Sequence, residues 1–170
     1  MTVGEPAEEP APAMQELRDG RGRYDVAIVT TAAPPWLTGP AYLTLHQAIG
    51  LAGLGLRVAH VVPWVGERDQ ARLWSGPTFG NRRAHLDWLA CEAARLGGSG
   101  APAFFHYRAC VSRLLRSVVP LEDPFRAAPP ARAMVLCEPE HLGWYLPAGP
   151  RTSVDAETVL GVVMTNYGYY

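Results

Sequence analysis

A chain of 170 residues, of which 48% are hydrophobic, is long enough for one domain with a substantial core. Its net charge of −1 excludes a general nucleic-acid binder, which would carry a basic stripe. All 15 basic residues are arginine, so chemistry that depends on a lysine is excluded as well.

The first residues predict a tail and no targeting segment. Residues 1–22 are rich in Pro, Ala and Glu, which is typical of disorder, and they lack the basic start and apolar stretch of a signal peptide. No apolar run further along is long enough to span a bilayer. We therefore expect a disordered tail over 1–22, one domain over 23–170, and a cytoplasmic protein that is at most peripheral on the inner face of a membrane.

The segment after this tail predicts a βαβ unit. Asp25–Thr31 (DVAIVTT) is a short β-branched run, typical of a buried strand. Prolines interrupt the next residues, and Thr38 or Gly39 can then cap a helix that begins at Pro40. Leu56–Pro63 is a second β-branched run, so the segment is predicted to form strand, loop, helix and parallel strand.

The rest of the chain alternates between further helices and strands. The predicted elements are a short helix or ordered loop at Gly66–Ser75, a helix at Arg82–Leu96 capped by Asn81, a strand at Ala103–Tyr107, a helix at Ala109–Val119, a loop at Leu121–Ala131, and strands at Ala133–Cys137 and Thr158–Met164. This alternation predicts the α/β class, with a Rossmann-like, mostly parallel sheet and helices on both faces. We expect the last strand to be buried, and a buried strand this near residue 170 predicts a fold that continues beyond it.

Three polar clusters follow predicted strands at their carboxyl ends, where open α/β sheets bind ligands. They are Trp36, Thr38 and Gly39; Glu138, Glu140 and His141; and Thr165, Asn166 and Tyr167. Parallel strands would bring all three clusters to one edge as the wall of a crevice. The helix that begins at Pro40 would point its free N–H groups there, a site suited to phosphate or sugar oxygens. The alternative is that loops at strand ends are polar in any case.

The second cluster also has the chemistry of a metal site. Carboxylate and imidazole groups are ordinary ligands, but no third and fourth ligand is evident in the sequence, so we expect none. An acid/base role for Glu138 or Glu140 would need partial burial. Trp36 and Trp144 lie on predicted loops, where they could stack on a sugar or contact a membrane surface.

Four motifs carry a resemblance to a known family. Their residues are Thr30-Thr31-Ala32, Pro35-Trp36 and Thr38-Gly39; Val62-Pro63-Trp64 with Asp69-Gln70; Glu138-Pro139-Glu140-His141-Leu142 with Trp144; and Gly161-Val162-Val163 with Thr165-Asn166-Tyr167. In this order, over about residues 24–170, they resemble the N-terminal domain of digalactosyldiacylglycerol synthases, which are retaining GT-B glycosyltransferases of family 4.

The resemblance implies the acceptor-side half of a GT-B architecture, in an enzyme that moves galactose from UDP-galactose onto a galactolipid. It implies no cofactor, and it places most contacts with the UDP-sugar donor in a C-terminal domain that is absent from these 170 residues. We expect the chain alone to be inactive or weak, because donor and acceptor must be held together across a cleft. The donor-binding domain is then either missing or supplied by a separately encoded polypeptide.

One residue departs from the family pattern. Met164 stands where the resemblance places a histidine that contacts the donor sugar near the reaction centre. A thioether accepts hydrogen bonds only weakly and donates none. If that contact stabilises the transition state, its loss costs on the order of 10²–10³ in rate. The catalytic residues are therefore left unassigned.

Other interpretations stay open. Met164 also fits a non-catalytic binding module, or a partner subunit, that keeps the acceptor crevice. A generic Rossmann-like domain for another nucleotide rests on analogy of fold alone. The expected partners are a sugar or glycolipid acceptor and no nucleic acid, and a membrane surface would be met by the arginines near aromatic residues at 108, 113 and 116.

Overall fold

The computed structural model describes residues 22–97, 100–115, 117–143 and 154–164, so the predicted tail lies almost wholly outside the described residues. The described strands are β1 (Tyr24–Val29), β2 (Val58–Trp64), β3 (Ala103–Ser112), β4 (Ser117–Pro120), β5 (Ala131–Cys137) and β6 (Ala156–Val162). The described helices are α2 (Gly39–Gly53), α3 (Glu67–Leu73), α4 (Arg82–Arg95), α5 (Pro124–Ala127) and α6 (Pro139–Leu142).

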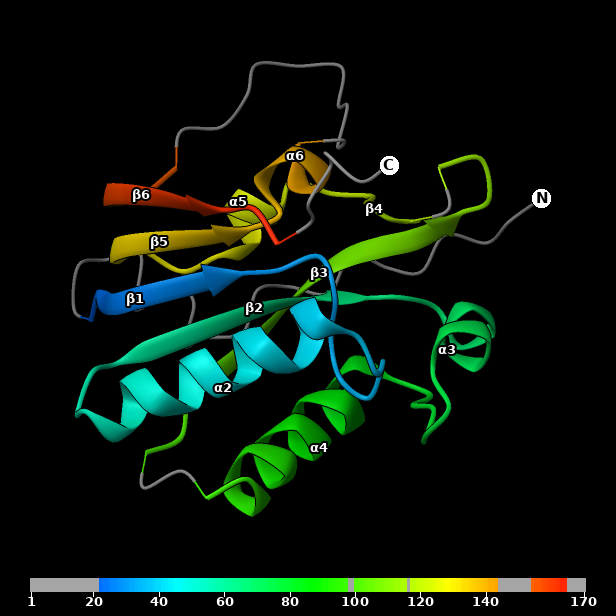
Figure 1. Ribbon diagram of the computed structural model, residues 1–170, viewed down its shortest axis with the longest axis horizontal. Coiled ribbons are helices and arrows are strands. Elements are labelled where there is room, and N and C mark those ends of the chain that lie inside the picture. Colours follow the sequence, from blue (N-terminus) through cyan, green and yellow to red (C-terminus); the bar gives the residue numbers. More distant parts are fainter. Residues whose placement is uncertain (1–21, 98–99, 116, 144–153, 165–170) are drawn as a thin grey trace.

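The six strands form one sheet in the order β4-β3-β2-β1-β5-β6 (Figure 1). All neighbouring pairs are parallel except β3 and β4. Strands β2 and β3 lie on one side of β1, and β5 and β6 lie on the other. The connections therefore leave in opposite directions at β1 and β5, which is the topological switch point of a Rossmann-like sheet. The predicted fold class is confirmed.

The predicted βαβ unit is present. Strands β1 and β2 pair in parallel, with Ile28 opposite His60. Helix α2 begins at Gly39 after the N-cap Thr38, with Pro40 in its first turn, as the sequence predicts. Its small residues allow close packing, because Ala48 and other alanines of α2 share a buried cluster with Ile28.

Helix α4 also follows its predicted signal, because the Asn81 side chain accepts a 2.9 Å hydrogen bond from the N–H of Ala84. Leu86, Leu89, Ala93 and Leu96 recur at helical spacing, but together they are not the face that the helix buries. The buried residues are His85, Leu89, Glu92 and Ala93. Leu86 and Leu96 are only half-buried, so the helix is rotated toward a polar side chain at His85.

The predicted helix at Ala109–Val119 is wrong. Strand β3 continues to Ser112 and returns through a turn as β4, with Val111 opposite Val118 in an antiparallel pair. The apolar residues at 111, 114, 115 and 118 have helical spacing, but two valines seven positions apart can equally face each other across a hairpin. Leu114, at the turn, is 92% exposed.

The prediction that the last strand is buried is also wrong. Strand β6 pairs with β5, with Leu160 opposite Val135, but it lies at the edge of the sheet. Leu160 is 52% exposed. A continuous apolar run is typical of a central parallel strand, and the sequence does not reveal that this strand has only one neighbour among the described residues.

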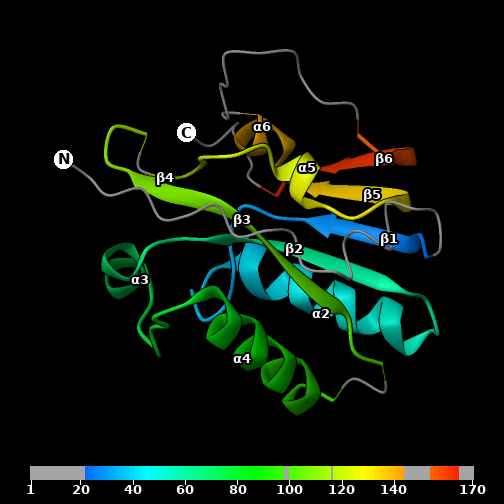
Figure 2. The same ribbon diagram turned by 180° about the vertical axis from the view of Figure 1, so that it is seen from behind.

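Two layers of packing flank the sheet (Figures 1 and 2). Helices α2 and α4 contact each other and lie on one face. On the other face, Ala27 and Val29 belong to the main core cluster, against which Phe125 of the short helix α5 packs. Among the described residues, none of the helices combines the length and apolar character that crossing a membrane requires.

Candidate functional site

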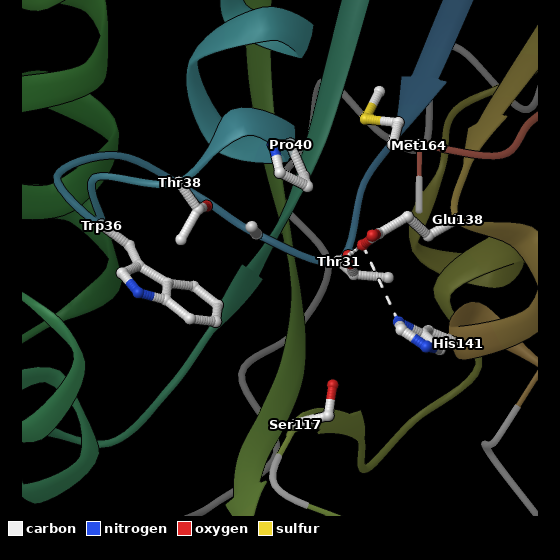
Figure 3. Close-up of a pocket in the computed structure, with 9 residues that line it drawn as sticks. Thr31, Trp36, Thr38, Pro40, Ser117, Glu138, His141 and Met164 are labelled. Atoms are coloured by element: carbon white, nitrogen blue, oxygen red, sulfur yellow. Dashed lines mark hydrogen bonds and ion pairs between the residues drawn. The ribbon is translucent and has the colours of Figure 1, made fainter. Parts of the chain in front are cut away.

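A pocket of about 240 Å³ lies at the carboxyl end of the sheet, beside the switch point between β1 and β5 (Figure 3). Its lining residues are Thr31, Ala32, Trp36, Thr38, Pro40, Ser117, Glu138, His141 and Met164. They come from the segments that follow β1, β5 and β6, from the start of α2 and from β4. The carboxyl ends of parallel strands meet at one edge, so residues far apart in the sequence converge there.

Glu138 is the central polar residue of this pocket. The hydroxyl of Thr31, 107 positions away in the chain, donates a short hydrogen bond to its Oε2 atom. The same Oε2 lies 3.8 Å from Nδ1 of His141. With only 7% of the residue exposed, this is a buried carboxylate tied to both sides of the switch point.

The backbone of Glu138 is unusual as well. Its φ of 58° and ψ of 60° place a residue with a Cβ in the left-handed region. Its N–H donates a 2.8 Å hydrogen bond to the carbonyl of Val162, which ties the start of α6 to the end of β6. Such conformations cost about 1–3 kcal/mol and cluster at functional sites. Here the conformation turns the carboxylate back over the end of the sheet.

The indole of Trp36 lies on the opposite side of the pocket from Glu138 and His141 (Figure 3). It is half-buried, so part of its ring is available to a ligand. Beside Trp36 in Figure 3, the hydroxyl oxygen of Thr38 is buried without a hydrogen-bond partner in the described part of the chain. An apolar ring facing carboxylate, imidazole and hydroxyl groups is an arrangement suited to a hydroxyl-rich ring such as a sugar.

Two histidines, the buried His85 and the half-buried His106, hold the loop that carries Trp36. Nε2 of His85 lies 2.8 Å from the carbonyl oxygen of Pro34. A carbonyl oxygen only accepts, so this nitrogen carries the proton, and Nδ1 of His85 accepts from Nε2 of His106 at 2.9 Å. Burial lowers the pKa of His85 to about 4 and that of His106 well below its usual value, with the charges of His85 and Arg82 adding to the shift for His106. This pair of histidines is therefore uncharged at neutral pH.

The structure brings together four of the six described residues that the sequence predicts for the site. Trp36, Thr38, Glu138 and His141 line one pocket, and Met164 lines it with them. Gly39 and Glu140 are chain neighbours of lining residues but do not line the pocket themselves. The predicted residues Thr165, Asn166 and Tyr167, and the loop residue Trp144, lie outside the described residues.

Sequence reasoning missed two polar residues of the pocket. Thr31 was assigned to the first strand, and its position directly after the last apolar residue was the signal that could have marked it. Ser117 reaches the pocket from β4, the strand that was predicted as helix. No pattern within a single segment could have placed Ser117, because its position depends on the hairpin.

The motif pair Asp69 and Gln70 has a structural role. The buried Gln70 amide donates to the carbonyl of Val65 at 2.8 Å and accepts from the N–H of Phe79 at 2.7 Å. Asp69 accepts a 3.0 Å hydrogen bond from the N–H of Val111 in β3. These contacts fix the loop around α3 and join it to the hairpin, away from the pocket.

The chemistry available at the pocket is hydrogen bonding and apolar contact. Within the described ranges, no group of three or more His, Cys, Asp or Glu side chains is placed to hold a metal ion. Helix α2 begins at the pocket with Pro40 in the lining, so N–H groups of its first turn face the same region. The volume is below the roughly 300–1,000 Å³ of pockets that enclose whole ligands, which suits part of a larger molecule.

Comparison with known proteins identifies plant relatives. The chain is 36% identical over 151 residues to digalactosyldiacylglycerol synthase 2, chloroplastic, of Glycine max, a match that covers 85% of this chain and 32% of that protein. For the synthase 2 of Lotus japonicus the identity is 35% over 156 residues, covering 87% and 33%. For digalactosyldiacylglycerol synthase 1, chloroplastic, of Arabidopsis thaliana it is 36% over 150 residues, covering 85% and 18%.

No protein-family model matches the chain. The chain spans about a third or less of the length of the curated relatives it matches. Each match nevertheless extends over at least 85% of this chain. The resemblance inferred from the four motifs is thus confirmed, and the chain is similar to one part of digalactosyldiacylglycerol synthases.

Proposed function

We propose that this chain is the acceptor-side, Rossmann-like half of a GT-B glycosyltransferase of family 4. In this proposal the complete enzyme transfers galactose from UDP-galactose to a galactolipid, and the pocket at the switch point binds the sugar of that acceptor. The names of the relatives, which are synthases of digalactosyldiacylglycerol, support the class of product. The domain would work at the inner face of a membrane, on the cytoplasmic side.

One observation carries the proposal. Two of the motifs that resemble the family, around Trp36 and around Glu138, form the two sides of a single pocket. The hydrogen bond from Thr31 to Glu138 joins them across 107 positions of sequence. The Rossmann-like fold by itself does not require a buried carboxylate, an imidazole and an indole around one cavity at this edge.

Each side of the pocket has a role in this proposal. The Glu138 carboxylate accepts hydrogen bonds from hydroxyls of the acceptor sugar and orients one of them toward the donor. His141 supports the carboxylate from 3.8 Å away. Trp36 packs against the apolar face of the sugar ring. In the transfer step this hydroxyl oxygen bonds to the galactose carbon as the bond from that carbon to the UDP oxygen breaks. The hydroxyl proton passes to the departing phosphate oxygen of UDP.

The proposal assigns most contacts with UDP-galactose to a second domain. The matched relatives have about two thirds or more of their length outside the match, which leaves room for it. The isolated chain is then expected to bind acceptor but to transfer galactose very weakly, because it does not hold the donor in place.

The test is transfer of radiolabelled galactose from UDP-galactose to monogalactosyl lipid in vesicles. The chain is assayed alone and together with the donor-binding half of a digalactosyldiacylglycerol synthase. We expect product only from the pair, with Glu138→Gln reducing it and the neighbouring Glu140→Gln leaving it unchanged. Robust transfer by the isolated chain, or a pair whose activity ignores Glu138, would overturn the proposal.

A second candidate function is a non-catalytic binding module. Met164 favours it, since this residue lines the pocket where the family resemblance places a histidine. The variant Met164→His in the reconstituted pair separates the two. A gain in turnover of about 10²-fold or more supports an enzyme that lacks one stabilising contact, and unchanged turnover supports a binding module.

A further inference from the structure

A second, apolar cavity opens along the middle of helix α2. It has a volume of about 530 Å³ and lies between α2 and the strands β1 and β5. Its lining residues are Ile28, Gln47, Gly50, Leu51, Leu54 and Val135, none of which is charged. We call this cavity the α2 groove. In Figure 1, β5 and β6 lie beyond the edge of α2, so the described helices leave this side of the two strands open.

One side of helix α2 runs from the pocket to the α2 groove. Positions 40, 43, 47, 51 and 54 are three or four residues apart and therefore share one side of α2. Pro40 at one end lines the pocket, and Leu54 at the other end lines the groove. Leu43 between them is 49% exposed and Leu54 is 79% exposed. Apart from Gln47 the stripe is apolar, and such a stripe facing solvent has a binding partner more often than scattered exposed leucines do.

On the side of the sheet, Met164 connects the pocket to the apolar residues around the groove. This side chain lines the pocket, and it also packs against the buried cluster that contains Ile28. Leu51 and Val135, which line the groove, pack against the same cluster. A flexible thioether therefore separates a polar cavity from an apolar one, and such a side chain can adapt to a chain that passes it.

We infer that the α2 groove binds one acyl chain of a glycolipid whose sugar occupies the pocket. The inference rests on the proposed function, and it adds a second subsite to the acceptor. The pairing of a hydroxyl- and carboxylate-lined pocket with an adjoining uncharged groove fits a ligand that has a polar head and an apolar tail. Neither a free sugar nor a soluble nucleotide has an apolar tail that would occupy the groove.

The dimensions agree with this ligand. From position 40 to position 54 the helix rises about 21 Å at 1.5 Å per residue. One leaflet of the hydrocarbon core is about 15 Å thick, which is the length that one acyl chain spans. The stripe is therefore long enough for a single chain laid along α2, with its head at the pocket.

The test compares galactosides that share a head and differ in their tail. Binding of methyl, hexyl and octyl β-galactoside to the whole chain is measured by calorimetry, below the micelle concentration of each. A fluorescent fatty acid, which has a tail but no sugar, is titrated in parallel. We expect the octyl compound to bind at least tenfold more tightly than the methyl compound, because each buried methylene adds several-fold.

The chain offers a variant that fills the groove without disturbing the fold. Gly50 lines the groove, and a Cβ built there meets no atom within 4 Å. Gly50→Leu therefore places a side chain in the groove and also favours the helix. Ala90→Leu adds the same side chain to the exposed face of α4 and is the matched control. Leu54→Gln, at an exposed position, removes apolar surface without filling the groove.

The outcomes separate this inference from the proposed function. A tail-dependent gain that Gly50→Leu abolishes, Leu54→Gln weakens and Ala90→Leu retains supports the inference. Equal binding of methyl and octyl galactoside refutes the groove and leaves the sugar pocket standing. If the fatty acid binds, Gly50→Leu abolishes that binding, and no galactoside binds, the groove is supported and the sugar pocket is refuted. A dimer of the chain that Gly50→Leu dissociates would show that a second copy occupies the groove, and would overturn the inference.

Discussion

Glu138 connects the two sides of the switch point through a single side chain. Its carboxylate accepts from Thr31 after β1, and its backbone N–H holds Val162 of β6. Both contacts depend on a left-handed backbone at a residue that is neither glycine nor asparagine. A glycine would adopt this backbone conformation at a lower cost. The carboxylate is therefore best explained by what it does for a ligand.

Replacing Glu138 with Gln tests this explanation. The amide oxygen can still accept from Thr31, so we expect the fold to persist, while galactoside affinity falls about tenfold as charge-assisted hydrogen bonds become neutral ones. Calorimetric titration with methyl β-galactoside measures the change. Glu140→Gln, in the first turn of α6, is the control. Equal losses in the two variants would mean that only the net charge of this region matters.

Tyr107 supports the same edge of the sheet from β3. Its ring is fully buried, and its hydroxyl donates a 2.9 Å hydrogen bond to the carbonyl of Thr30, next to the pocket. We expect Tyr107→Phe to lower the free energy of unfolding by about 1 kcal/mol, because the carbonyl loses a partner away from water. Urea denaturation at neutral pH measures the loss. An unchanged midpoint would show that water replaces the hydroxyl.

At the scale of elements, two histidines that stay neutral hold the β1–α2 region: His85 contacts the loop at Pro34, and His60 contacts Thr44 of α2. Burial lowers the pKa of His85 to about 4 and that of His60 to about 3. In the unfolded chain histidine takes up a proton below about pH 6.5. Between pH 6.5 and 4 the unfolded state therefore binds more protons than the folded state, and stability falls as the pH falls.

The expected slope is about 1.4 kcal/mol per pH unit for each histidine that remains neutral. The free energy of unfolding is measured in urea at pH 7 and pH 5. In His85→Gln, whose amide can still donate to the carbonyl of Pro34, we expect a smaller loss between the two pH values. His46→Gln, at an exposed position of α2, should keep the wild-type loss. If the free energy of unfolding of His85→Gln falls between the two pH values by as much as that of the wild type, the role assigned to His85 is contradicted.

The elements that could be predicted from sequence are those with local signals. Helix α2 has a proline in its first turn, α4 has Asn81 as its cap, and β1 has a β-branched run. The β3–β4 hairpin could not be predicted, because Val111 and Val118 satisfy helical spacing and hairpin pairing equally well. Only the contacts of β3 with the neighbouring sheet and with Asp69 decide between them.

At the scale of the molecule, the alternation of strands and helices was enough to predict at which edge of the sheet the pocket lies. Parallel strands place Trp36 and Glu138 at one edge whatever the details of the loops. The exposure of β6 could not be predicted, because it follows from the position of β6 at the edge of the sheet, and the sequence of a single strand does not determine the order of the strands. The position of Ser117 in the pocket could not be predicted either, because it depends on the β3–β4 hairpin.

The most direct test is a titration of the ¹⁵N-labelled chain with methyl β-galactoside, followed by the shifts of its amide signals. The account predicts saturable shifts that cluster at Thr31, Trp36, Thr38, Glu138 and His141, the lining residues on both sides of the switch point. It predicts that Glu138→Gln weakens them all together. Shifts confined to one side of the pocket, shifts centred on the β3–β4 hairpin, or no saturable shifts would contradict the account.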